Sequence, residues 1–118
     1  MDIETLINGD AAKCLTSLGG EPRQWIYAGA SFTMLSITGS GAGSESKPEF
    51  FLVVSVTAPI REVCEYYRDL LREIYETVDC EEWDGATMLQ SQDVRIVIAP
   101  QPGLDNRVTD INIGRTRL

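Results

Sequence analysis

The most constraining feature of this sequence is an amphipathic helix pattern over residues 59–78. Apolar side chains recur there at intervals of mostly three or four residues, and charged residues fill most of the other positions. A period of about 3.6 residues predicts a helix of about five turns with one face packed on other structure. Pro59 suits the first helical turn, and Glu62 interacts favourably with the helix dipole. The apolar stripe consists of Ile60, Val63, Cys64, Tyr67, Leu70, Leu71, Ile74 and Val78.

Two strand-like segments precede this helix. Residues 24–38 are rich in aromatic and β-branched side chains, which predicts one long strand or two shorter strands bent at Gly29. Residues 50–57 begin as a nearly continuous apolar run, which is typical of a strand inside a sheet. Between them, residues 39–48 consist mainly of glycine and serine, and we expect a flexible loop.

Further strands are predicted after the helix. Residues 86–91 and 94–99 read as a hairpin that turns at Gln92-Asp93. Residues 108–113 alternate apolar and polar side chains, which predicts a half-buried strand, and we place it at a sheet edge. The intervening residues 79–85 are acidic, and we interpret them as a turn.

The N-terminal segment, residues 2–18, is predicted as a short helix interrupted at Asn8-Gly9. Asp10 suits the N-cap of its second part, and Gly19-Gly20 ends it. The element order is therefore α-β-β-α-β-β-β. Because helices gathered on a mostly antiparallel sheet form two layers, we predict a single α+β domain over residues 1–118. It has about five strands, and the 59–78 helix lies across one face.

Composition excludes several functional classes. The net charge is −8, and a protein that binds phosphate backbones or anionic membranes directly needs concentrated positive charge. The chain has no histidine, so a Ser-His-Asp or Cys-His catalytic site cannot be built within it. Three scattered cysteines favour free thiols in a reducing compartment, and the acidic start carries no secretory pattern. We therefore expect a cytoplasmic protein.

Known ligand-binding motifs fit poorly. The glycine-rich loop at 39–48 lacks the Gly-Lys-Ser/Thr ending and the following helix of a phosphate-binding loop. The acidic cluster that starts at Asp79 has Trp83 and Asp84 where a calcium loop needs an oxygen ligand and a glycine. The sequence therefore predicts no cofactor, no metal site and no catalytic residue, and we expect no enzyme activity.

The uneven distribution of charge is the most informative functional signal. Residues 61–84 hold nine acidic and three basic side chains, so three quarters of the net charge of −8 falls in this segment. Like-charged pairs four residues apart, such as Glu65 with Asp69, destabilise a helix rather than support it. The candidate partner-binding residues are Glu65, Asp69, Glu73, Glu76, Asp79, Glu81, Glu82, Trp83 and Asp84.

We hypothesise that this electronegative face binds a basic protein partner, with Trp83 or Tyr66 as the aromatic anchor. The chain would then be an adaptor or chaperone-like protein, or an inhibitor that occupies the groove of a nucleic-acid-binding protein. The plain alternative for the charges is a solvated surface that serves solubility. A second functional hypothesis is a small-ligand-binding or minor enzymatic domain with a pocket between sheet and helix. A homodimer through the last strand is also open.

Overall fold

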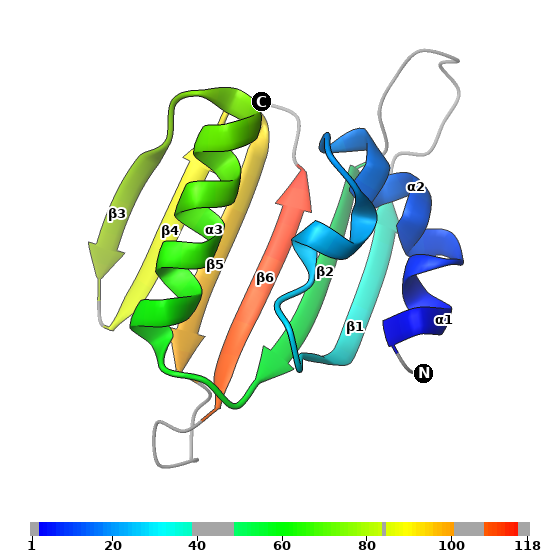
Figure 1. Ribbon diagram of the computed structural model, residues 1–118, viewed down its shortest axis with the longest axis horizontal. Helices are drawn as coiled ribbons and strands as arrows, with labels where there is room; N and C mark the ends of the chain where they lie inside the picture. Colours follow the sequence, from blue (N-terminus) through cyan, green and yellow to red (C-terminus); the bar gives the residue numbers. More distant parts are fainter. Residues whose placement is uncertain (1–2, 39–48, 84, 101–107, 116–118) are drawn as a thin grey trace.

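The computed structural model describes residues 3–38, 49–83, 85–100 and 108–115. Its elements follow the chain as three short helices, two strands, a long helix and four strands (Figure 1). The bounds are α1 Ile3–Ile7, α2 Asp10–Ser17, η1 Pro22–Trp25, β1 Ser31–Thr38, β2 Glu49–Val56, α3 Ile60–Tyr75, β3 Asp79–Trp83, β4 Ala86–Ser91, β5 Val94–Pro100 and β6 Thr109–Arg115. The loop predicted at 39–48 lies outside the described residues.

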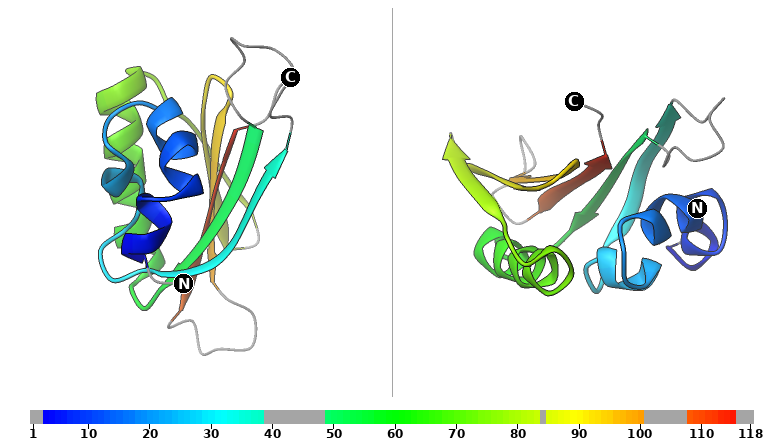
Figure 2. Two further views of the ribbon diagram at one scale, coloured as in Figure 1. Left: turned by 90° about the vertical axis from the view of Figure 1, so that its right-hand side faces the viewer. Right: turned by 90° about the horizontal axis from the view of Figure 1, so that it is seen from above.

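The strands form one six-stranded antiparallel sheet in the order β1-β2-β6-β5-β4-β3. All the helices lie on the same face of this sheet: α3 covers β4 and β5, and the N-terminal helices cover β1 and β2 (Figures 1 and 2). The two-layer α+β prediction is therefore confirmed, with six strands in place of about five. No helix among the described residues is long and apolar enough to cross a membrane.

The additional strand is β3, which corrects the acidic turn predicted at residues 79–85. Asp79 to Trp83 pair in register with β4, from Asp79 opposite Gln90 to Trp83 opposite Ala86. The edge position explains how so acidic a segment can be a strand, because its outer side faces solvent.

The placement of the last strand at an edge was also wrong. β6 lies between β2 and β5 and pairs with both, so it occupies the middle of the sheet. It cannot pair with a second copy of the chain without breaking this sheet. Its alternation reflects one face packed under the helices and one face open, because Ile111 and Ile113 are buried while Asp110 and Asn112 point the other way.

Helix α3 follows the predicted stripe closely. Its buried side chains are Val63, Cys64, Tyr67, Leu70 and Leu71, and Pro59 stands at the N-cap. The helix ends at Tyr75 because the next residue, Glu76, adopts a positive φ of 70°. Its ψ of −40° lies outside the left-handed helical region, and the Thr77 N–H donates to the Tyr75 carbonyl at 2.8 Å across it, as in a γ-turn.

The segment before β1 differs from the predicted long strand. Pro22 begins the short helix η1, whose N-cap Glu21 and third residue Gln24 form a reciprocal capping box. Trp25 is therefore helical and fully buried, and its indole N–H donates to the carbonyl of Gly19 at 2.8 Å. The break between α1 and α2 at Asn8-Gly9 is confirmed, although Gly9 occupies the N-cap expected for Asp10, with no side-chain cap.

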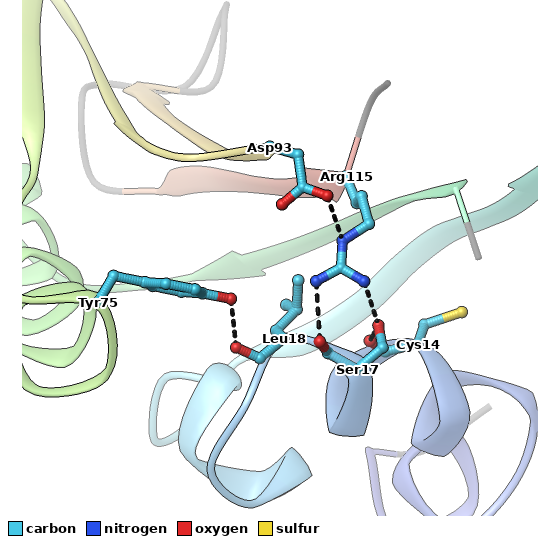
Figure 3. Close-up of polar contacts among 6 residues, drawn as sticks. All are labelled: Cys14, Ser17, Leu18, Tyr75, Asp93 and Arg115. Atoms are coloured by element: carbon cyan, nitrogen blue, oxygen red, sulfur yellow. Dashed lines mark hydrogen bonds and ion pairs between the residues drawn. The ribbon is translucent and has the colours of Figure 1, made fainter. Parts of the chain in front are cut away.

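A buried arginine joins the N-terminal helices to the sheet (Figure 3). Arg115, at the end of β6, donates to the carbonyl of Ser17 at 2.8 Å and to its Oγ at 3.0 Å. Ser17 is the last residue of α2, so the guanidinium satisfies a helix-terminal carbonyl and complements the negative end of the helix. Arg115 Nε also lies 3.1 Å from Oδ2 of Asp93 in the β4–β5 turn, as an ion pair without hydrogen-bond geometry.

Candidate partner-binding surface

The acidic residues predicted to bind a partner lie on α3, at its C-cap and on β3. Strand β3 forms the edge of the sheet next to the strands that α3 covers (Figure 1). All of them in the described part of the chain are solvent-exposed: Glu65, Asp69, Glu73, Glu76, Asp79, Glu81 and Glu82. Trp83 ends β3, and Asp84 lies outside the described residues.

None of these carboxylates forms an ion pair within 4.0 Å among the residues that the structure describes. Within the described residues, ion pairs closer than 4.0 Å join only Arg23 to Glu4, at 2.7 Å, and Arg115 to Asp93, at 3.1 Å. Neither pair involves α3 or β3. The negative charge of the segment is therefore presented to solvent, where it attracts positive groups over about a Debye length.

The charges of α3 are nevertheless segregated around the helix. Spacings of three and four residues place Glu62, Asp69 and Glu73 on the side of Tyr66. That side faces the N-terminal segment, because the Tyr66 hydroxyl donates to the carbonyl of Gln24 at 2.6 Å. The acidic surface is thus not a single uniform patch.

The opposite side of α3 carries its arginines. Arg61 and Arg68 line an open groove of about 490 Å³ between α3 and the β3–β4 hairpin, and Arg72 follows Arg68 by one helical turn. The groove is lined by Ile60, Arg61, Cys64, Glu65, Arg68, Glu82, Gly85, Ala86 and Thr87. The seven-residue spacing of the arginines is visible in the sequence, but their convergence with β3 depends on β3 being a strand, which the sequence did not predict.

Arg68 is the least satisfied charged group in this groove. Its Nε atom is shielded from solvent and has no hydrogen-bond partner within the described structure. Next to it, burial raises the pKa of the Cys64 thiol, an effect partly offset by a hydrogen bond with Thr87. The groove therefore holds two arginines and two glutamates around a neutral thiol, and Arg68 Nε is its one buried side-chain nitrogen or oxygen atom without a hydrogen-bond partner in the described structure.

Strand β3 has one free edge. It pairs with β4 on one side, and no other described strand pairs with its outer side. Cys80 and Glu82 are opposite the buried Leu89 and Thr87 and so face α3, whereas Asp79 and Glu81 face the open side of the sheet. An incoming strand would meet acidic side chains on both faces.

The aromatic anchor candidate Tyr66 is already engaged within the chain. Its ring packs edge-to-face on Tyr27 and Tyr67, with centroid separations of 5.3 and 5.1 Å. Burial raises the pKa of both Tyr66 and Tyr67. Tyr67 is fully buried, accepting from the Tyr27 N–H at 3.1 Å and donating to the Trp25 carbonyl at 2.7 Å. These tyrosines hold α3 against the N-terminal segment.

Within the part of the chain that the structure describes, no group of three or more Cys, Asp or Glu side chains is arranged to hold a metal ion. Cys14, Cys64 and Cys80 are free thiols, and Cys80 is the exposed one. No match to this chain was found among protein-family models, curated proteins or solved structures.

Proposed function

We propose that this chain is a non-enzymatic protein-binding module that holds a basic partner on the acidic surface of α3 and β3. The observation that carries the proposal is the set of exposed carboxylates, from Glu65 to Glu82, that form no ion pair with any described residue. A surface selected only for solubility is typically interspersed with both signs, whereas this segment holds nine acids against three bases. The resulting field accelerates encounter with a positive partner and disfavours negative ones.

The free edge of β3 supports a specific mode of binding. An extended segment that adds to a sheet edge gains main-chain hydrogen bonds, and its side chains provide specificity. The edge of β3 repels a second copy of itself, because three of its five residues are acidic. A basic extended segment suffers no such repulsion.

The proposal includes two versions, an adaptor or chaperone-like protein and an inhibitor of a nucleic-acid-binding protein. Both operate in the cytoplasm, where free thiols remain reduced. The alternative of a small-ligand or minor enzymatic domain is less favoured, because the groove beside α3 is open and lined by four charged side chains rather than closed and apolar.

The test is capture of partners from nuclease-treated lysate at about 50 mM and then about 500 mM salt, read by mass spectrometry. The proposal predicts a basic partner that is retained at low salt and released at high salt. Reversing Glu81 and Glu82 to lysine should abolish retention. The matched control reverses Asp2 and Glu45, which changes the net charge equally but lies outside the acidic segment 61–84, and it should retain the partner. If both double charge reversals reduced retention of the partner equally, a localised binding site would be refuted.

A further inference from the structure

The sheet ends in two edges of opposite character. At one end, β3 carries three acidic side chains among its five residues, and such charges discourage other strands from pairing with an edge. At the other end, β1 pairs with β2 alone, and no further described strand lies on its outer side. Its eight residues, Ser31–Thr38, include no charged residue and no proline. This edge therefore lacks the side chains that usually prevent strand pairing.

The N-terminal helices do not seal the β1 edge. Of the seven β1 side chains that the structure describes, five are exposed and none is buried. Met34 is 46% exposed on the open face of the sheet, and Ile37 is 40% exposed on the helical face. A third exposed apolar side chain, Phe51, lies opposite Ser36 on β2. A strand added to this edge would cover apolar surface on both faces of the sheet.

The regular part of this edge is Met34–Thr38. A bulge precedes it, whereas its five residues pair one for one with β2. Two identical strands that pair antiparallel are related by a two-fold axis, so this segment can pair with the same segment of a second copy. Full overlap places the axis at the central residue, Ser36, and sets Ile37 beside Leu35 of the second copy.

The distribution of charge favours a second copy over a charged partner at this edge. Three quarters of the net charge of −8 falls in residues 61–84, and β3 is the strand farthest from β1 (Figure 1). Five strand spacings, about 24 Å, separate them, which exceeds the Debye length of about 8 Å at physiological ionic strength. The acidic segments of two copies joined at β1 therefore repel each other little. A second copy also brings an uncharged strand of matching length.

We infer that two copies of this chain join by antiparallel pairing of their β1 edges, with the two-fold axis at Ser36. The joint sheet has twelve strands, six from each copy, and carries all the helices on one face. An acidic β3 edge lies at each end of it. This inference goes beyond the proposed function and does not depend on it, because it requires no basic partner.

The first test is the molar mass of the full chain, measured by light scattering over a concentration series. The mass is expected to rise from one chain to two and no further. Ser36→Lys sets two lysines opposite each other, and Ser36→Glu sets two glutamates, so each variant alone should dimerise at least about fivefold more weakly. An equimolar mixture of the two variants should recover the dimer, because a lysine then faces a glutamate.

Met88→Lys is the matched control. It places a lysine on the same open face but on β4, inside the sheet, and it should leave the dimer unchanged. Hydrogen exchange provides a second readout that needs no substitution. The amides of residues 31–38 should exchange more slowly at high protein concentration, whereas those of residues 79–83 should not change.

Four outcomes would overturn the inference. The first is a monomer at every concentration, with the chain folded by circular dichroism. The second is a dimer that Met88→Lys weakens as much as Ser36→Lys does, which would assign the contact to the open face. The third is a mass beyond two chains with slower exchange at residues 79–83, which would show β1 pairing with β3 of another copy. The fourth is a mixture of the two Ser36 variants that fails to recover the dimer. All four leave the proposed function standing, because no basic partner is present.

Discussion

Replacing Arg115 with alanine should be among the most destabilising single changes in this protein. The side chain is 2% exposed, and it holds the last carbonyl of α2 and the Ser17 hydroxyl against the end of β6 (Figure 3). The alanine variant leaves that carbonyl without its charged donor and opens a space in a covered region. It also leaves Asp93 without its ion-pair partner.

The magnitude follows from these contacts. A hydrogen bond from a charged group contributes about 1.5–3 kcal/mol, and Arg115 makes two to Ser17. Asp93 is 40% exposed, so the ion pair adds only about 0–1 kcal/mol. The two hydrogen bonds end on one residue and are not fully additive, and we expect a total loss of about 3–5 kcal/mol. Since a domain is stable by about 5–15 kcal/mol, this is a large fraction of the total.

Urea unfolding followed by circular dichroism provides the assay. At a slope of about 1.5 kcal/mol per molar, the midpoint should fall by about 2–3 M. Arg115→Lys should lie between the alanine variant and the parent, because an ammonium cannot reproduce the forked contact. Asp93→Asn should change stability by less than about 1 kcal/mol. Arg95→Ala is the control, since Arg95 is exposed on the neighbouring strand and should change stability by no more than about 0.5 kcal/mol.

A loss smaller than about 1 kcal/mol for Arg115→Ala would refute this reasoning. It would mean that Ser17 finds equivalent partners in water, and that the N-terminal helices do not depend on the arginine for their position. A loss equal to that of Arg95→Ala would lead to the same conclusion.

Three further predictions concern the backbone, the buried phenol and the thiols. Glu76→Gly should stabilise the protein by about 1 kcal/mol in thermal denaturation because it relieves the positive φ, whereas Glu76→Ala keeps the strain and should give no gain. Burial raises the pKa of Tyr67 above its unfolded value, so its contribution to stability is present below about pH 10 and is lost as the pH rises through the folded value. Tyr67→Phe should therefore be less stable at pH 7, by about 1–3 kcal/mol, but show a shallower alkaline decline in urea titrations between about pH 8 and 11. With a chromogenic disulfide reagent, the exposed Cys80 should react first and the buried Cys14 only on unfolding, and fast labelling of Cys14 in a Cys64→Ser, Cys80→Ser double variant would contradict the packing of α2.

The sequence predicted those elements whose signal lies in a short, regular pattern of neighbouring residues. The stripe from Ile60 to Leu71 predicted α3 because one side of that helix faces the sheet throughout. The hairpin of β4 and β5 was predicted because its strands flank a two-residue turn, where Gln92 has a positive φ of 55°. Both signals depend only on neighbours in sequence.

Elements whose identity depends on distant partners were missed. Asp79 to Trp83 have the composition of a turn, and they form a strand because β4 offers an edge to pair with. The alternation in β6 correctly indicated one buried face, but a pattern of faces contains no information about lateral position in the sheet. Trp25 has strand propensity, yet the capping box around Pro22 places it in a short helix.

The candidate site was likewise predicted only in part. The exposed acids of α3 were predicted because charged positions on an amphipathic helix face solvent. The arginine groove was not predicted, because Arg68 and Glu82 line one groove only when β3 is paired with β4.

The central position of β6 has a consequence for biosynthesis. Every main-chain contact between the β1–β2 half of the sheet and the β5–β4–β3 half runs through residues 109–115. While a ribosome is still making the chain, β2 and β5 therefore have no neighbour on the sides that β6 later occupies. Each half presents a temporary apolar edge, and such edges pair readily with other nascent chains. We expect the vulnerable period of this protein to end only when β6 leaves the exit tunnel and joins the two halves.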